Sequence, residues 1–519
     1  MSNYMYVEGK KIKDKDGNDI LLRGVGLGGW MLPEGYMWGS HGYYNRPRRF
    51  EELVSYYLDT EASSWWNTYY KTWISDQDFN LIKEHGYNSV RLPMNYRLLM
   101  NENDSDETVT LNEYGFNMID YTIEQCEKNG LYLILDLHGA PGGQTGANID
   151  DSKDDYPHLF EEEKYQIQFI TLWEEIARRY RDNETICMYD LINEPIPEKF
   201  KHLNDLLEPL HEKTINAIRA IDTNHIICIE GNNWASQFET ITKKLDENMV
   251  LHFHKYWNPP SIEQIQRFLD KREEFDLPLF MGEGGENDLY WYSSNFKMYE
   301  QLDISWNFWA YKKRENHNSI ISFDLPKNWR NIFDKENRIP KEQGRELLYS
   351  FLENIKFENC KVNNDVTNSL FYKDEFFTSG GIYDYLGRGK SFMLSEEFES
   401  STIRKGDKTH ICNADGNEFK GVWGCHNKEQ QELELFPYVK GNPGDIYKYS
   451  FKITKNHKET KTITITHKDL DADFYINGEI IEVENADGIY TLEFKGRKGL
   501  NRLTIEPVNN GVIKIITFK

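Results

Sequence analysis

The chain has 519 residues, of which 39% are hydrophobic and 28% charged, proportions typical of a folded globular protein. This length exceeds one ordinary core, so we expect one large domain and one smaller domain. No apolar run approaches the roughly 20 residues that span a bilayer, which argues against a membrane-spanning protein. With 85 acidic against 61 basic side chains, the net charge of −24 opposes contact with phosphate, so nucleic acid and anionic lipid are poor candidate partners.

The N-terminal segment "MSNYMYVEGKKIKDKDGNDILLRG" lacks an apolar stretch as long as a secretory signal needs, so we expect a cytoplasmic location. The six cysteines form no CxxC pair, and three lie in apolar helix or strand patterns. We therefore expect reduced core cysteines rather than disulfides or zinc ligands. The sequence gives no indication of the oligomeric state.

From residue 20 to about 355, short apolar runs rich in strand-forming residues alternate with segments of helical periodicity. This alternation predicts parallel strands joined by crossover helices, and eight such units close a (β/α)₈ barrel. The eight expected strands are Ile20–Gly29, Tyr87–Asn95, Leu131–Gly139, Ile186–Pro195, His225–Asn232, Met249–Tyr256, Leu277–Gly285 and Ile304–Tyr311.

Beyond about residue 358 the helical pattern gives way to alternating strands with turn signals. This pattern predicts an antiparallel β-sandwich. We therefore expect a barrel domain over residues 1–358 and a sandwich domain over residues 359–519.

Several of the predicted strands end in residues that could perform chemistry. They are Arg91, His138, Asn193, Glu194, His254, Tyr256 and Glu283. Barrels of this class carry their active sites at the carboxyl ends of the strands, so these side chains are expected to converge. Strands commonly end in polar residues, which would explain why these residues are polar. It does not explain why two carboxylates, two histidines and an arginine occur together at the same end of the strands.

Two motifs suggest other chemistry. "GVGLGG", residues 24–29, satisfies the dinucleotide pattern G-x-G-x-x-G, but no helix pattern follows it, so we expect no nucleotide cofactor and interpret the glycines as allowing close backbone approach at the barrel floor. "HFH" places His252 and His254 on one face of a strand, where they could bind a metal together with Glu194 or Glu283. A metal-dependent barrel hydrolase is therefore kept as an alternative to a site without metal.

The two glutamates, Glu194 and Glu283, suggest a different reaction. Two carboxyl groups flanking one bond are the minimum apparatus for glycoside hydrolysis: one protonates the leaving oxygen, and the other attacks carbon or activates water. No G-x-S-x-G elbow or P-loop is present, which removes the commonest serine-hydrolase and phosphoryl-transfer interpretations.

Seven motifs resemble glycoside hydrolase family 5, of the clan A retaining glycosidases. In chain order they are "RGVGLGGW", "NSVRLPMNY", "LDLHG", "INEP", "HKYW", "FMGEGG" and "ISWNFW". The resemblance covers roughly residues 5–350. It implies a (β/α)₈ barrel that hydrolyses β-glycosidic bonds with retention, through a covalent glycosyl-enzyme.

The resemblance also implies residue roles. Glu194 would be the acid/base and Glu283 the nucleophile, with Arg91 and Tyr256 orienting Glu283. Asn193 would bind the 2-hydroxyl of the sugar at the cleavage site. His138 and His254 would bind sugar hydroxyls and the carboxylate network, and Trp309 would be the platform beneath this sugar unless it is simply part of the barrel packing.

Within the family, the segment 65–96 and "LDLHGAPGGQTG" are most similar to the exo-β-1,3-glucanase and β-glucosidase branch. This implies an exo-acting enzyme on oligosaccharides or small glycosides. Its pocket walls are expected to include tryptophans of the first strand–helix connection: Trp30, Trp38, Trp65 and Trp66. Helix core is the alternative for Trp65 and Trp66. Endo-β-glucanase (cellulase), β-mannosidase and glycosylceramidase activities of the same family stay open. A carbohydrate-binding protein without catalysis is a further alternative.

Two segments bear on specificity. "NIDDSKDDYPHLF", residues 148–160, departs from the fungal pattern, and its acidic cluster near the rim leaves the substrate open. The closing strands of the C-terminal domain are similar to carbohydrate-binding modules, for which Trp423 and Tyr447 are candidate ligand-binding aromatics. A purely structural role for this domain is the alternative.

Overall fold

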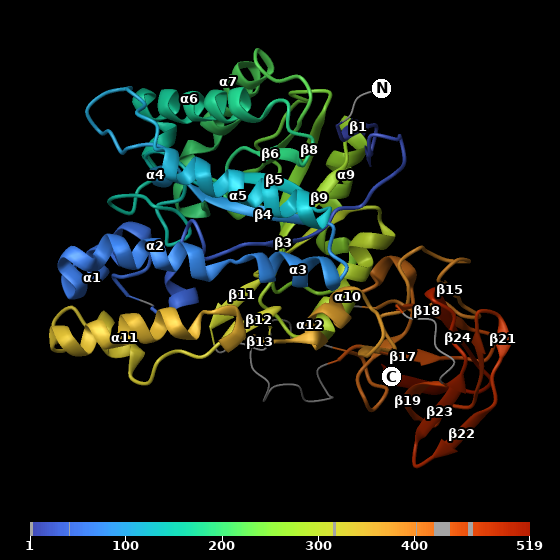
Figure 1. The fold of residues 1–519 in the computed structure, drawn as a ribbon. Helices are drawn as coiled ribbons and strands as arrows, with labels where there is room; N and C mark the ends of the chain where they lie inside the picture. Colours follow the sequence, from blue (N-terminus) through green and yellow to red (C-terminus); the bar gives the residue numbers. More distant parts are fainter. Residues whose placement is uncertain (1–3, 41, 315–317, 401, 420–435, 455–459) are drawn as a thin grey trace. The chain divides into compact units, whose positions relative to one another are not determined.

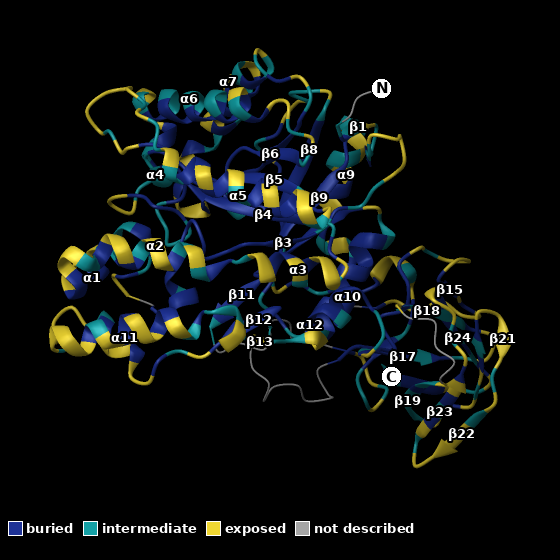
Figure 2. Ribbon diagram, viewed as in Figure 1, coloured by how far each residue is buried: buried dark blue, intermediate teal, exposed yellow. Residues whose placement is uncertain are grey.

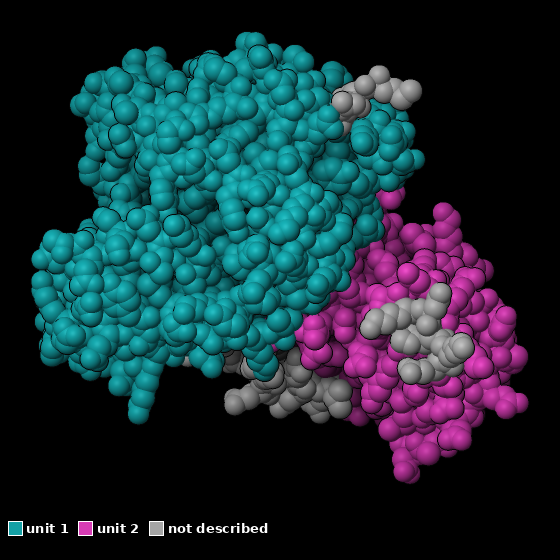
Figure 3. Space-filling view, viewed as in Figure 1, with its two compact units in different colours: residues 1–255, 267–284, 305–362 teal, residues 256–266, 285–304, 363–519 magenta. Residues whose placement is uncertain are grey.

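The computed structural model describes residues 4–40, 42–314, 318–400, 402–419, 436–454 and 460–519. The chain forms two compact units. The first contains residues 1–255, 267–284 and 305–362, and the second contains residues 256–266, 285–304 and 363–519 (Figure 3). No helix in the described part of the chain is long and apolar enough to cross a membrane.

The first unit is built on a closed parallel barrel, as the sequence predicts (Figure 1). Its strands are β3 (Arg23–Gly26), β4 (Ser89–Asn95), β5 (Tyr132–Gly139), β6 (Ile186–Asp190), β7 (Ile226–Glu230), β8 (Met249–His254), β9 (Leu279–Gly285) and β10 (Ser305–Trp309). Each strand pairs with its neighbour in the sequence, and β10 pairs with β3 to close the barrel. Every strand lies inside its predicted range, and several are shorter because the polar residues at their ends form loops.

Helices separate the strands, and several of the longer ones are amphipathic with a largely apolar buried face (Figure 2). They are α1 (Pro47–Leu58), α2 (Ala62–Trp73), α3 (Asp76–Glu84), α4 (Tyr96–Leu99), α5 (Glu113–Asn129), α6 (Glu163–Tyr180), α7 (Leu207–Arg219), α8 (Asn232–Ala235), α9 (Gln266–Phe275), α10 (Leu289–Gln301) and α11 (Lys341–Asn354). A short sheet of β11 (Lys312–Arg314), β12 (Ile321–Phe323) and β13 (Lys361–Val362) follows the barrel.

An apolar floor closes the amino-terminal end of the barrel. The N-terminal hairpin of β1 (Tyr6–Glu8) and β2 (Lys11–Lys13) contributes Ile12 to a buried cluster that also includes Met188 and Phe280. A catalytic site is therefore expected at the opposite, carboxyl-terminal end of the barrel, where the strands carry polar residues.

The second unit contains α12 (Asn364–Leu370) and two antiparallel sheets, in agreement with the predicted sandwich. One sheet has the order β16 (Ile411–Cys412), β17 (Tyr438–Gly441), β25 (Gly511–Phe518), β19 (Lys461–Lys468), β23 (Ile489–Phe494) and β22 (Val483–Ala486), with β14 (Phe376–Ser379) also paired to β25. The other has the order β15 (Phe392–Met393), β18 (Ile446–Ile453), β24 (Gly499–Pro507), β20 (Ala472–Ile476) and β21 (Glu479–Ile480).

Aromatic side chains fill the space between these two sheets. The rings of Phe451 on β18 and Phe518 on β25 lie 4.8 Å apart, and those of Phe474 and Tyr490 are equally close. Tyr447 is fully buried and its hydroxyl donates to Asp445, so its predicted role as a ligand-binding aromatic is wrong. Trp423 lies outside the described residues.

Candidate active site

The carboxyl ends of the barrel strands bring together all but one of the predicted site residues. Arg91 lies on β4, His138 on β5, His254 on β8, Glu283 on β9 and Trp309 on β10. Asn193 and Glu194 follow β6 directly. Three further residues, which the sequence did not point to, complete the group together with His252, expected only as a possible metal ligand: Asp136, Asp190 and Glu230.

Arg91 organises the centre of the group. Its guanidinium donates to Glu283 at 2.7 Å, to Asp190 at 2.8 Å and to Asn193 at 2.9 Å. Asp136 and Glu230 lie 3.1 and 3.3 Å from the same guanidinium. Burial opposes its charge, but the surrounding carboxylates outweigh burial and raise the pKa of Arg91 well above its ordinary value. Arg91 is therefore a permanent buried cation among carboxyl groups.

Glu194 is held at its backbone and at one side-chain oxygen. Its φ of 49° is left-handed, a conformation that costs energy for a residue with a side chain and is found at functional sites. Its amide donates to Glu230 at 2.6 Å, and its Oε1 lies 2.7 Å from Nδ1 of His254. Burial raises the pKa of Glu194 to about 7, and the nearby charge of Glu283 adds to this effect.

The carboxylates of Glu194 and Glu283 are close neighbours. One oxygen of each lies, with a ring nitrogen of His254, in a group whose atoms are all within 4.8 Å of one another. Their surroundings differ, because Glu283 receives a hydrogen bond from a guanidinium, whereas Glu194 is hydrogen-bonded to an imidazole. Two carboxyl groups in unlike surroundings can take different protonation states at one pH.

His138 links the group to Trp309. Its Nδ1 lies 2.7 Å from Asp136 and its Nε2 lies 3.2 Å from Nδ2 of Asn193, so a neutral ring donates to the first and accepts from the second. Burial lowers the pKa of His138 to about 3, which keeps the ring neutral. The ring stacks on Trp309, with centroids 5.5 Å apart and planes inclined by 5°.

Trp309 is fixed from its other edge. Its indole nitrogen donates to the hydroxyl of Tyr36 at 2.7 Å. Gly26 and Gly28 lie against the indole, and a Cβ on either would approach it to 2.5 or 2.7 Å. Gly26 and Gly28 of "GVGLGG" therefore make room for Trp309, whereas Gly29 lies against Trp73. Only Gly24, which lies against Ser89 at the start of β4, fits the expected role near the floor.

Tyr256 follows β8 by two residues and is partly buried. It belongs to the second compact unit, and its ring lies 5.6 Å from that of Trp257. Its expected interaction with Glu283 stays a prediction.

Three of the four expected wall tryptophans are core residues. Trp30, Trp38 and Trp65 are at most 2% exposed. Trp38 contacts the rings of Trp65 and Phe351, and the indole nitrogen of Trp65 donates to the carbonyl of Leu348. The predicted role of Trp30 and Trp38 as pocket walls is wrong, because they fill the space between the first connection and the outer helices. Trp65 agrees with the alternative of helix core, and Trp66 is partly buried and stacks on Trp38.

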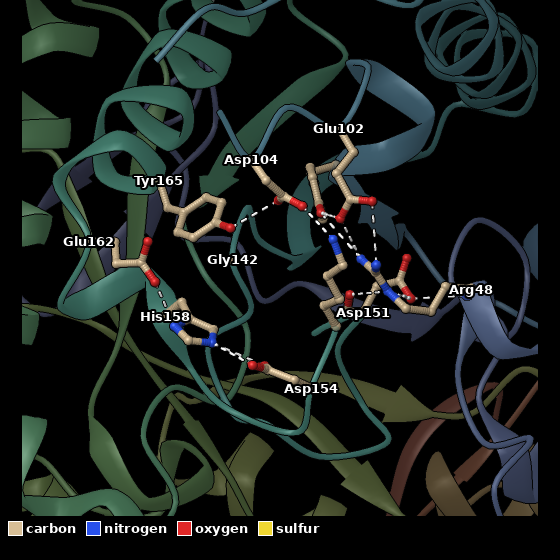
Figure 4. A pocket seen from close by; sticks show the side chains of 11 residues that line it. Arg48, Glu102, Asp104, Gly142, Asp151, Asp154, His158, Glu162 and Tyr165 are labelled. Atoms are coloured by element: carbon tan, nitrogen blue, oxygen red, sulfur yellow. Dashed lines mark hydrogen bonds and ion pairs between the residues drawn. The ribbon is translucent and has the colours of Figure 1, made fainter. Parts of the chain in front are cut away.

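The acidic segment 148–160 lines a polar cavity of about 180 Å³ (Figure 4). Arg48 donates to Glu102 at 2.7 Å, and the hydroxyl of Tyr165 donates to Asp104 at 2.9 Å. His158 lies between Asp154 and Glu162 (Figure 4). Its Nε2 is 3.0 Å from Asp154, and its Nδ1 is 2.7 Å from Glu162. Within the acidic segment itself, Asp151 pairs with Arg97 and Asp155 with Arg49, each at 2.8 Å, so part of its negative charge is balanced by arginines.

Some of these side chains have the spacing of metal ligands. Within the described residues, Glu230, His252 and His254 form one such group, and Glu194, His254 and Glu283 form another. Hydrogen bonds engage the same atoms, since Nε2 of His252 lies 3.0 Å from Nε2 of His254. The spacing allows a cation, and the hydrogen bonds account for the arrangement without one.

Comparisons with known proteins agree with this geometry. A family model described as cellulase (glycosyl hydrolase family 5) matches residues 54–315. A β-xylosidase from Phanerodontia chrysosporium is 33% identical over 346 residues, which cover 60% of this chain and 71% of that protein. Cellodextrinase A from Ruminococcus flavefaciens is 26% identical, covering 68% of this chain and 98% of that protein. Glucan 1,3-β-glucosidase I/II from Saccharomyces cerevisiae is 27% identical, covering 52% and 62%.

The matched region contains seven of the eight barrel strands and both glutamates. The chain belongs to glycosyl hydrolase family 5 and is a glycoside hydrolase.

Proposed function

We propose that this enzyme hydrolyses β-glycosidic bonds with retention of configuration, with Glu194 as acid/base and Glu283 as nucleophile. One observation carries the proposal: carboxylate oxygens of the two residues lie within 4.8 Å of each other. Retaining enzymes place their carboxyl groups about 5–5.5 Å apart, whereas inverting enzymes need about 6.5–9.5 Å to admit a water molecule. The short separation favours direct attack by a carboxylate on the sugar.

The surroundings of the two carboxyl groups support these roles. A nucleophile has to be ionised, and Glu283 is paired with the permanent cation Arg91 at 2.7 Å. A general acid has to hold a proton near neutral pH, and the raised pKa of Glu194, about 7, provides for this.

The reaction then proceeds in two displacements. Glu283 attacks the anomeric carbon while Glu194 transfers its proton to the departing oxygen, giving a glycosyl-enzyme ester and an alcohol. In the second step Glu194 takes a proton from water, whose oxygen attacks the anomeric carbon and releases Glu283 as a carboxylate. The proton lost by Glu194 in the first step is thus restored in the second.

The remaining residues bind the sugar in this proposal. Trp309 is the platform beneath the sugar at the cleavage site, and Asn193 donates to its 2-hydroxyl through the amide hydrogen that does not point at His138. His138, His254 and Tyr256 complete the polar lining. The amide oxygen of Asn193 already accepts a hydrogen bond from Arg91. Its nitrogen, which also contacts His138, is therefore the atom that binds the 2-hydroxyl, as a donor.

For the substrate, we propose exo-action on gluco-oligosaccharides or small β-glucosides. The similarity to a yeast glucan 1,3-β-glucosidase supports this choice, and the similarity to a β-xylosidase makes β-xylosides the first competitor. Hydrolysis of a panel of aryl β-glucosides and β-xylosides, and of laminari-, cello-, manno- and xylo-oligosaccharides, decides between them. Release of internal fragments from the oligosaccharides would contradict exo-action.

Covalent trapping tests the mechanism. A 2-deoxy-2-fluoro glycoside of the preferred sugar should inactivate the enzyme, and peptide mapping should find the label on Glu283. A label on Glu194 would reverse the roles, and a first-formed product of inverted configuration in proton NMR would exclude retention.

A metal-dependent hydrolase is the second candidate, favoured by the ligand-like spacing of Glu230, His252 and His254. EDTA treatment separates the two mechanisms. Activity that is lost in EDTA and recovered with zinc would replace the two-glutamate mechanism, whereas unchanged activity supports it.

A further inference from the structure

Gln144 lies in the loop after β5 and joins the ends of two barrel strands. Its Nε2 donates to the carbonyl of His138 at 2.6 Å and to the carbonyl of Asn193 at 3.0 Å. Its Oε1 accepts from the amide of Ala140 at 3.1 Å. These partners fix the orientation of the side-chain amide, because two carbonyl acceptors face one end and an N–H donor faces the other. Gln144 is fully buried and ties the end of β5 to the turn that follows β6.

The main chain of Gln144 holds the same turn at a second point. The amide of Ile196 donates to the carbonyl of Gln144 at 3.2 Å. In the sequence, Asn193 directly precedes Glu194, and Ile196 follows Glu194 with one proline between them. Gln144 therefore binds the turn on both sides of Glu194, once through its side chain and once through its backbone.

This turn has a backbone that needs support from its surroundings. Glu194 and Ile196 both have a left-handed conformation, with φ of 49° and 51°. This conformation is unfavourable for residues with a side chain, most of all for a β-branched one, and it persists only where neighbouring contacts impose it. Further contacts come from Glu230, which accepts from the amide of Glu194 at 2.6 Å, and from Asn233, whose amide donates to the carbonyl of Ile196 at 2.9 Å. Without the two bonds to Gln144, the turn should relax and the carboxyl group of Glu194 should move.

The acidic segment 148–160 holds Gln144 itself in place. Oδ2 of Asp150 accepts from the amides of residues 144, 145 and 146 at 3.1, 2.8 and 3.0 Å. Oδ1 of Asp150 accepts from the amide of Ser152 at 2.9 Å. Asp150 is fully buried, so its carboxylate anchors the loop from within. The departure of this segment from the fungal pattern thus has a structural consequence for the active site.

We propose that Gln144 is a positioning residue for the acid/base: it holds the turn that carries Glu194 so that the carboxyl group can reach the leaving group, and Asp150 fixes Gln144. The proposal rests on the proposed role of Glu194 as acid/base. Because Gln144 acts only through the turn, its loss should be greatest where protonation of the leaving group limits the rate.

The chain offers a matched control residue. Gln168 on α6 is also buried, and its Nε2 donates to the carbonyls of Asn103 and Asp106 at 2.7 and 2.8 Å. Like Gln144 it ties two main-chain carbonyls, but these lie in the connection between α4 and α5, which carries none of the site residues. Methionine has a similar length and no donor, so Gln→Met removes the same kind of hydrogen bonds at either position.

Leaving-group dependence tests the proposal. In Gln144→Met, kcat/KM for alkyl glycosides should fall roughly 10- to 100-fold, part of the 10²–10⁴ that a general acid supplies. With a 2,4-dinitrophenyl glycoside, whose leaving group needs little acid, it should fall less than about 3-fold. Gln168→Met should lose less than about 3-fold with both substrates, even if it lowers Tm as much. Equal losses with both substrates in Gln144→Met, or the same pattern in Gln168→Met, would overturn the proposal.

A second measurement does not depend on activity. Hydrogen–deuterium exchange of a peptide that contains residues 193–196 should be faster in Gln144→Met than in the wild-type enzyme, and unchanged in Gln168→Met. Unchanged exchange in Gln144→Met would overturn the proposal even if the enzyme is an active glycosidase. If the wild-type enzyme hydrolyses no glycoside, the proposed function fails, and the exchange result still decides whether Gln144 holds the turn.

A variant of the anchor covers the case in which Gln144→Met does not fold. Asp150→Asn removes the charge from the oxygens that hold residues 144–146 and leaves Gln144 in the chain. It should show the same leaving-group dependence and the same faster exchange of residues 193–196. An Asp150→Asn enzyme with wild-type exchange and wild-type rates on alkyl glycosides would overturn the proposal.

Discussion

The chemistry of the site depends on how one buried cation is shared. Arg91 contacts the nucleophile candidate Glu283 and, on its other nitrogens, Asp190 and Asn193. A planar guanidinium can serve several acceptors at fixed angles, which a lysine cannot do. Arg91 therefore keeps one carboxylate ionised and at the same time orients the amide that lies beside it.

The unlike surroundings of the two glutamates predict a pH profile. The general acid works only when protonated, and the pKa of Glu194 in the free enzyme is about 7. We expect kcat/KM to fall as the pH rises through about 7, since Glu194 loses its proton there. A basic limb below about pH 5.5 would contradict the assignment. In Glu194→Gln the limb should disappear together with activity toward poor leaving groups.

Replacing the guanidinium of Arg91 provides a second prediction at this scale. Arg91→Lys keeps the charge but loses the fork that holds Glu283, Asp190 and Asn193. We expect kcat/KM to fall by at least about 100-fold, because the nucleophile and the 2-hydroxyl ligand both lose their fixed positions. Arg178, exposed on α6 and paired with Glu175, provides the control. Arg178→Lys should leave the rate unchanged, and Arg91→Lys at the wild-type rate would refute the role of the fork.

The sequence pointed to polar residues that belong to a recognisable motif but not to Asp136, Asp190 and Glu230. Asn193, Glu194 and Glu283 were recognisable because they interrupt apolar runs. Asp136 and Asp190 lie within such apolar runs. A single acidic residue in a strand has no sequence pattern that identifies it as the buried partner of an arginine such as Arg91. Glu230 was not recognised at all, and His252 was expected only as a possible metal ligand, because their contact joins two strands that only the closed barrel brings together.

At the scale of elements, the first strand is built around the platform. β3 carries Gly26 on the side that meets Trp309 of β10, and Gly28 follows in the loop. Parallel pairing of Val25 with Phe308 fixes this register. The glycines and Trp309 were both noted in the sequence, but the sequence could not show that Gly26 and Gly28 lie against the indole of Trp309. It also could not tell that Trp38 and Trp65 are core residues, since buried and exposed tryptophans look alike in a sequence.

Gly26→Ala tests this packing. The added Cβ would lie 2.5 Å from Cε3 of Trp309, so the indole has to move away from its stack on His138. We expect KM for the glycone to rise and Tm to fall, with overpacking costing about 1–3 kcal/mol. Gly42→Ala, in the connection that follows β3, is the control because a Cβ there meets nothing within 4 Å. Equal behaviour of the two variants would show that Trp309 tolerates displacement.

At the scale of the whole molecule, the sequence predicts a boundary at residue 358, which stays an expectation. The packing of the second unit uses segments from within the barrel sequence: residues 256–266 and 285–304, the latter including α10. Lys297 on α10 is buried, donates to the carbonyl of Ile382 at 3.0 Å and lies 3.8 Å from Asp384. A prediction that assigns each domain to one continuous stretch of sequence cannot detect this interleaving.

This interleaving predicts the outcome of truncation. A chain ending at residue 358 would lose the partners of α10, leaving Lys297 without Ile382 and Glu300 without Tyr372 and Lys452. Uncovering apolar helix surface and unpairing buried charges are both costly, so the truncated chain should be insoluble or melt far below the full chain. Circular dichroism melting of residues 1–358 against residues 1–519 measures this, with aryl-glycoside hydrolysis as the second readout. A truncated chain that melts and turns over like the full chain would mean that the barrel is independent of the C-terminal sheets, and that carbohydrate binding rather than support has to explain why they are there.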